Sequence, residues 1–189
     1  MHPKEFKKVK NNTGYLTKES LKNAELFIGI DFSEHKRINE IIETHESYIL
    51  FPSEDAINLS KDNPKEAAED SKNLAIFLID STWACTTKMF NESVNLRKLK
   101  HMSFESSRVS EYQIKEQPKE NYLSTIESTH VVLELLDKWG VENLKSQNLN
   151  GFLNPFFKMI EYQKDIIANS RSCALRYKKR TDNYKRNLK

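Results

Sequence analysis

Residues 74–83 read LAIFLIDSTW, six apolar residues followed by an acid, two hydroxyl side chains and a tryptophan. An unbroken apolar run of this length predicts a strand that is buried on both faces, as in the parallel sheets of α/β proteins. We expect this strand, Leu74–Ile79, to lie at the centre of the sheet. Asp80 would then lie at the carboxyl end of a parallel strand, where α/β proteins bind ligands and helix N-termini present free N–H groups.

The composition is that of an ordinary globular domain. The chain has 189 residues, of which 38% are hydrophobic and 30% charged, with 4 Gly and 5 Pro, and these values exclude a fibrous or disordered protein. No apolar run approaches the roughly 20 residues that a membrane helix needs. The first ten residues, MHPKEFKKVK, lack the apolar centre of a signal peptide. We therefore expect no membrane contact and a cytoplasmic location.

The two cysteines, Cys85 and Cys173, are far apart in the sequence and have no CxxC spacing. Neither a disulfide framework nor a cysteine zinc site is indicated, so we expect reduced thiols and no bound metal.

Short apolar runs alternate with amphipathic segments along the chain. Besides Leu74–Ile79, the sequence predicts strands at Glu25–Ile30, Tyr48–Phe51, His101–Phe104 and Glu111–Lys115. It predicts helices from an N-cap at Ser33 to about Thr44, within Asp62–Asn73, and at Trp83–Asn91, Ser124–Trp139 and Gly151–Asn169. This alternation is typical of an α/β domain with a mostly parallel sheet flanked by helices. We place that domain at residues 1–170 and a basic C-terminal tail at residues 171–189.

The tail, RSCALRYKKRTDNYKRNLK, carries eight Lys or Arg against one acid. Its net charge is +7 in a chain of net +3, so the other residues together carry −4. Lys and Arg displace phosphate counterions, and the interleaved Tyr177 and Tyr184 offer rings to unpaired bases, so an RNA-binding tail is one interpretation. The residues that would contact RNA are Lys178, Lys179, Arg180, Lys185 and Arg186. The other interpretation is a solvated terminus, which basic tails often form.

Two local patterns have a structural explanation as well as a functional one. Asp80 or Ser81 could cap the helix that begins near Trp83, and Trp83 itself could belong to the core. In LSTIES, Ser124 and Glu127 fit the S-x-x-E capping box, in which each side chain satisfies a backbone donor of the other.

Near the N-terminus, HPKE (residues 2–5) and NNTG (residues 11–14) contain helix-breaking residues. We expect both to be loops.

Seven stretches occur in a fixed order along the chain: HPKE, NNTG, ELFIGIDFS, ILFPSEDA, DSTW followed by KMF, SEYQIKEQP and LSTIES. Together they resemble the DTW-domain family, the tRNA-uridine aminocarboxypropyltransferases, over His2–Trp139, and DSTW fits the D-x-T-W signature of that family. The resemblance implies a SPOUT-like fold with a knotted C-terminal half. It also implies S-adenosylmethionine as donor, tRNA as partner, and transfer of the 3-amino-3-carboxypropyl group to N3 of a uridine.

The resemblance also implies the site residues. Asp80 matches the position at the catalytic centre. Residues that match the donor pocket are Ser81, Thr82, Trp83, Leu123, Ser124, Thr125 and Glu127. Thr13 and Gly14 match an RNA-contacting loop. The sequence departs from the family in lacking both the cysteine cluster with which many members open and the strand expected just ahead of HPKE.

Two other functions stay open at this point. A SPOUT-type RNA methyltransferase would use the same donor but hold its methyl group in line with the nucleophile. A non-catalytic RNA-binding protein would keep the fold and the basic tail without the donor site.

Overall fold

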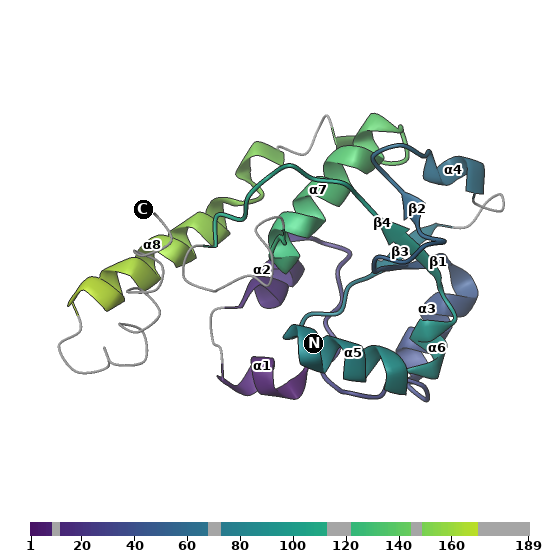
Figure 1. The fold of residues 1–189 in the computed structure, drawn as a ribbon, viewed down its shortest axis with the longest axis horizontal. Coiled ribbons are helices and arrows are strands. Elements are labelled where there is room, and N and C mark those ends of the chain that lie inside the picture. The colour runs from purple at the N-terminus through teal and green to yellow at the C-terminus, as the bar shows by residue number, and fades with distance from the viewer. Residues whose placement is uncertain (9–11, 68–72, 113–121, 145–148, 170–189) are drawn as a thin grey trace.

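The computed structural model of the chain describes residues 1–8, 12–67, 73–112, 122–144 and 149–169. Within these ranges the helices are α1 (Pro3–Lys8), α2 (Thr13–Ser20), α3 (Lys36–Thr44), α4 (Pro64–Ala67), α5 (Trp83–Glu92), α6 (Val94–Arg97), α7 (Thr125–Lys138) and α8 (Asn154–Asn169), with a 3-10 turn at Leu149–Gly151. The strands are β1 (Glu46–Leu50), β2 (Ile57–Asn58), β3 (Leu74–Phe77) and β4 (Lys100–Ser103) (Figure 1).

The four strands form one sheet in the order β2-β4-β1-β3, and every pair of neighbours is parallel. The predicted α/β architecture with a parallel sheet flanked by helices is therefore confirmed. The expectation that Leu74–Ile79 forms the centre of the sheet is wrong, because β3 lies at one edge and its side chains are all half-buried. The two interior strands are β1 and β4, and in β1 Tyr48 and Ile49 are fully buried.

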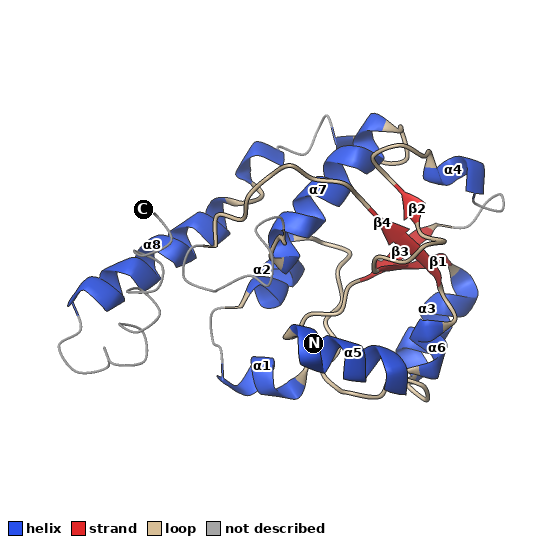
Figure 2. Ribbon diagram, viewed as in Figure 1, coloured by secondary structure: helices blue, strands red, loops and turns tan. Residues whose placement is uncertain are grey.

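Helices cover both faces of the sheet (Figure 2). Since side chains alternate along a strand, Ile49 faces α3, α5 and α6, whereas Tyr48 faces α7. Phe77 of β3 joins the first cluster and Ile76 joins the second. The run of apolar residues in β3 thus contributes to both layers, as the sequence predicts for a strand between two helical layers.

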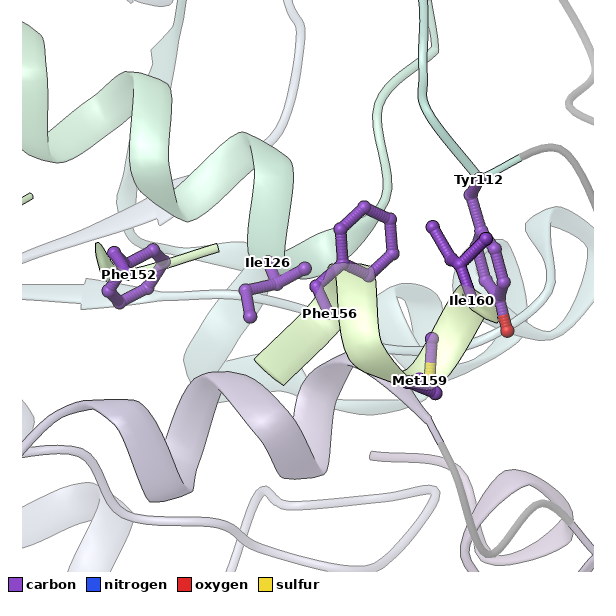
Figure 3. Close-up of a cluster of buried hydrophobic side chains, with 6 residues drawn as sticks. All are labelled: Tyr112, Ile126, Phe152, Phe156, Met159 and Ile160. Atoms are coloured by element: carbon purple, nitrogen blue, oxygen red, sulfur yellow. The ribbon is translucent and has the colours of Figure 1, made fainter. Parts of the chain in front are cut away.

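A third apolar cluster attaches α8 to α7 (Figure 3). Ile126 at the start of α7 and Phe156 in α8 are fully buried there, and the Tyr112 ring meets the Phe156 ring edge-on at 5.6 Å between centroids. Leu16 of α2 packs against the same cluster. These contacts place α2 beside the N-terminal turn of α7.

The predicted strand at Glu25–Ile30 is wrong, because the segment has no regular strand structure. Its backbone groups pair instead with Met1. The Met1 amine donates to the Phe27 carbonyl at 2.7 Å, and the Gly29 N–H donates to the Met1 carbonyl at 3.2 Å. The next residue, His2, donates its N–H to the Asp80 carbonyl at 3.1 Å. Residues 27–29 are thereby connected to the end of β3 through Met1 and His2.

The first two helices correct the expectation that HPKE and NNTG are loops. Pro3 occupies the first position of α1, where a missing N–H costs no hydrogen bond. Asn12 caps α2, because its side-chain oxygen accepts the Tyr15 N–H at 2.7 Å. Residues that break a helix interior therefore serve here as helix starts.

Three further predictions need correction. The N-cap of α3 is His35 and not Ser33. The Ser33 hydroxyl instead donates to the Asp31 carboxylate and accepts the Val94 N–H. The short strand β2 was not predicted, since two residues leave no alternating pattern in the sequence. The predicted strand at 111–115 is absent at residues 111 and 112, and its remaining residues lie outside the described ranges.

The predicted helices at Trp83–Asn91, Ser124–Trp139 and Gly151–Asn169 are confirmed as α5, α7 and α8 with small shifts of their ends. In the described ranges, no helix combines the length and the apolar character needed to cross a membrane.

Ser93 provides a test of the packing between residues 30–32 and the α5–α6 junction. Its fully buried hydroxyl accepts the Phe32 N–H at 3.1 Å and donates to the Ile30 carbonyl at 3.2 Å. Ser93→Ala leaves both backbone groups without this partner, so we expect the free energy of unfolding in urea to fall by about 1–3 kcal/mol. The exposed Ser53→Ala should change it by less than about 0.5 kcal/mol. Equal effects of the two substitutions would contradict this account.

Candidate functional site

Asp80 lies three residues beyond the end of β3 and is half-buried. The Thr125 hydroxyl, on the first residue of α7, donates to Asp80 Oδ1 at 2.6 Å. DSTW and LSTIES are therefore in direct contact, although 45 positions separate the two bonded residues. Such a hydrogen bond fixes one carboxylate oxygen and restricts the rotation of the side chain.

Gly14 lies directly against the Asp80 side chain. A Cβ atom at this position would come within 2.6 Å of both Cγ and Oδ2 of Asp80, closer than real Cβ contacts. A glycine is therefore needed for α2 to approach the carboxylate. The amino end of α2 carries a partial positive charge, which favours a carboxylate at this place. Thr13 is buried, and its carbonyl accepts the Thr17 hydroxyl at 2.7 Å.

The structure argues against a capping role for the Asp80 carboxylate. The N-cap of α5 is Thr82, which makes no side-chain cap hydrogen bond, and the described hydrogen bond of the carboxylate goes to Thr125. The Ser81 hydroxyl oxygen is buried and has no hydrogen-bond partner in the part of the chain that the structure describes. Thr82 is exposed, and the side chain of Trp83 lies outside what the structure describes.

Glu127 forms the predicted capping box with Ser124, whose N–H donates to it at 2.8 Å. Glu127 is only 6% exposed, and its carboxylate also accepts the Ser124 hydroxyl, the Ser110 hydroxyl at 2.8 Å and the Glu111 N–H at 2.7 Å. Four donors thus converge on one side chain. Glu127 thereby fixes residues 110 and 111 against the N-terminal turn of α7.

Ser110 and Glu111 also belong to this site, although the sequence did not predict them as site residues. A signal for them was present, since they open the SEYQIKEQP stretch. Their contact with Glu127 joins residues 110 and 111, the start of that stretch, to LSTIES. Leu123, just ahead of the capping box, lines a small cavity of about 320 Å³ on this side of α7 together with Arg108 and His130.

A larger cavity of about 1440 Å³ reaches Asp80, Thr125 and Gly14. Its walls include apolar side chains of β3 and α7 together with residues 17–27, and they also carry charged side chains such as Arg37. A carboxylate and a hydroxyl at the border of such a cavity can exchange a proton with a bound group.

Burial lowers the pKa of the Met1 amine, and the nearby Asp80 carboxylate opposes that change. Among the residues that the structure describes, no three His, Cys, Asp or Glu side chains are grouped so that they could hold a metal ion. The predicted RNA-contacting residues of the tail, from Lys178 to Arg186, lie outside the described ranges.

Comparison with known proteins gives a consistent result. The family model of the DTW domain matches residues 1–164. A Drosophila melanogaster protein named tRNA-uridine aminocarboxypropyltransferase 2 is 24% identical over 131 residues, which is 69% of this chain and 48% of that protein. The Mus musculus protein of the same name is 32% identical over 116 residues, 59% of this chain and 37% of that protein. The chain thus spans less than half the length of these relatives. No solved structure matches the chain at a significant level.

The contact between Gly14 and Asp80 predicts an unusual response to an added methyl group. Ala normally stabilises a helix relative to Gly by roughly 0.5–1 kcal/mol. At Gly14 the new Cβ would overlap Asp80, so we expect Gly14→Ala to lower the free energy of unfolding by about 1–3 kcal/mol. Gly151→Ala is the control, because its Cβ would meet Asn154 at an ordinary 3.7 Å. A Gly14→Ala protein as stable as the natural one in thermal and urea unfolding would contradict the observed approach.

Proposed function

The chain belongs to the DTW domain family, and from that premise we propose that it transfers the 3-amino-3-carboxypropyl group of S-adenosylmethionine to N3 of a uridine in tRNA. The names of its relatives support tRNA uridine as the acceptor. The observation that carries the proposal is the contact between Asp80 and Thr125, which joins the family signature to LSTIES at the end of β3. The SPOUT-like relationship, the knotted C-terminal half and a cytoplasmic location stay predictions.

Asp80 is the proposed general base. A uridine N3–H is a weak acid, and the nitrogen becomes an effective nucleophile only when a base removes or shares its proton. Thr125 holds one oxygen of the carboxylate and Gly14 packs against the side chain, so the acid has a defined direction before substrate binds. A base fixed in this way loses little entropy when the acceptor nitrogen arrives.

The Ser81 hydroxyl supports a polar ligand next to Asp80. A buried hydroxyl without a partner is costly, and a bound donor molecule could supply the missing hydrogen bond. Ser81, Thr82, Leu123 and Thr125 are the residues proposed to hold it, with the side chain of Trp83 as a further candidate. S-adenosylmethionine supplies an electrophilic carbon next to a sulfonium. When N3 attacks that carbon, the N–C bond forms, the C–S bond breaks and methylthioadenosine leaves, while Asp80 takes the N3 proton.

The resemblance implies that Ser124 and Glu127 line the donor pocket, but this proposal gives them a positioning role. Their side chains are hydrogen-bonded to each other, and Glu127 also holds residues 110 and 111. They therefore position the Leu123–Thr125 turn rather than offer free groups to the donor. For RNA binding, the basic tail and the first two residues of α2, Thr13 and Gly14, stay proposals.

The product of the reaction tests the proposal directly. Purified protein is incubated with unmodified tRNA and S-adenosylmethionine, and the nucleosides are then analysed by mass spectrometry. We expect uridine to gain about 101 Da, the mass of an aminocarboxypropyl group, with methylthioadenosine as co-product, because the bond that breaks is the one held in line with N3. A gain of about 14 Da would instead establish a methyltransferase. Donor binding without any gain on RNA would contradict tRNA uridine as the acceptor.

Asp80→Asn tests the role of the acid. Asn keeps an oxygen that can accept from Thr125 but cannot take up the proton, so turnover should fall by about two to four orders of magnitude. Donor affinity, measured by isothermal titration, should stay within a few-fold. Asp55→Asn, at an exposed turn, is the matched control and should leave turnover unchanged. Full turnover in Asp80→Asn, with or without a loss of stability, would show that the carboxylate is structural.

A further inference from the structure

Two exposed aromatic rings lie on α2, which contacts Asp80 through Gly14, and on α1, which directly follows His2, the residue whose N–H donates to the Asp80 carbonyl. Phe6 on α1 is 47% exposed and Tyr15 on α2 is 44% exposed. The other exposed aromatic side chains in the described ranges, Phe157 and Tyr162, are both on α8. Large exposed rings point to a binding surface when they gather beside a candidate site.

Each ring belongs to a residue within one helical turn of a residue that contacts Asp80. Tyr15 directly follows Gly14, which packs against the carboxylate. The Phe6 N–H donates to the His2 carbonyl at 3.3 Å, and the His2 N–H donates to the Asp80 carbonyl at 3.1 Å. One turn of helix advances about 5.4 Å. The backbone positions of both rings are therefore near the proposed base.

Cationic side chains accompany the rings. Lys4 and Lys7 are exposed on α1, and neither forms an ion pair with another residue that the structure describes. On α2, by contrast, Lys18 is paired with Glu19 at 2.7 Å. Unpaired lysines attract phosphate groups, and aromatic rings stack on unpaired bases. Exposed rings beside such lysines are typical of surfaces that bind single-stranded nucleic acid.

We propose that Tyr15 and Phe6 stack on unpaired bases of the RNA loop that presents the uridine to Asp80, while Lys4 and Lys7 contact its phosphates. The proposal rests on the proposed function for RNA as the substrate, and it makes the two rings positioning residues for that substrate. Bases inside a duplex cannot stack on a protein ring, so this surface selects loops over helical RNA. Because every base has a face that can stack, the rings determine where the loop lies and not which sequence it has.

Equilibrium binding of a fluorescent oligouridylate of about seven nucleotides tests the rings without any need for transfer. We expect Tyr15→Leu and Phe6→Leu each to weaken binding about 5- to 100-fold, as the loss of one stacked base predicts. Tyr15→Phe and Phe6→Tyr keep a ring and should bind within about twofold of the natural protein. Tyr162→Leu removes a ring of α8 that is more exposed, at 59%, and is the control, with no expected change. Thermal unfolding of each variant checks that these exposed substitutions leave the fold intact.

An abasic oligomer of the same length separates stacking from charge. Its weaker binding should not respond further to Tyr15→Leu or Phe6→Leu, since the partner of the ring is already missing. Lys4→Ala and Lys7→Ala should each reduce the slope of log affinity against log salt by about one, the value for one phosphate contact. This reduction should be the same for oligouridylate and for the abasic oligomer. The proposal is overturned if the leucine variants bind oligouridylate as the natural protein does, or if they weaken the abasic oligomer equally.

The outcomes also distinguish this inference from the proposed function. Ring-dependent binding of oligouridylate in a protein that modifies no tRNA would support the surface and contradict the transferase. Normal modification of tRNA, with the same Michaelis constant for tRNA in Tyr15→Leu and Phe6→Leu, would support the transferase and overturn the surface.

Discussion

The hydrogen bond from Thr125 to Asp80 is the contact on which the candidate site depends. It joins the end of an edge strand to the first turn of α7, and α7 in turn covers one face of the sheet. The approach of α2 is possible only because Gly14 has no side chain. Three segments that are distant in sequence therefore meet at one carboxylate.

Hydrogen bonds and apolar contacts around Thr125 hold the first turn of α7 in place. Glu127 gathers four donors from Ser110, Glu111 and Ser124, which ties the start of α7 to the segment that follows β4. The cluster around Ile126 and Phe156 then fixes the same turn from the apolar side. A proton-accepting group needs such support, because a small displacement from the reacting atom is costly in rate. Phe6 and Tyr15 are not among the residues of this cluster, and both rings are exposed.

The relation between β3 and its neighbours shows why an apolar run is an incomplete guide to position in a sheet. Leu74–Phe77 packs against helices on both faces of the sheet, and this packing explains why its residues are all apolar. Position within the sheet is a matter of hydrogen bonding along the edges, and side-chain hydrophobicity does not report it. β1 is interior although its sequence, ESYIL, is less apolar, because it pairs with both β3 and β4. The same reasoning explains Glu25–Ile30, whose backbone pairs with Met1 rather than with a strand of the sheet.

What the sequence by itself determined are the features that depend on near neighbours. The apolar run ending at Asp80, the capping box of Ser124 and Glu127, and the helices α5, α7 and α8 all follow from spacing within one or two turns. The order of the strands, the partner of the Asp80 carboxylate and the place of α2 came only from the tertiary structure. Thr125 lies 45 positions from Asp80, and contacts at that separation are selected by how whole layers pack. Local propensity contains no record of that packing, since the same helix or strand can form wherever its apolar face is covered.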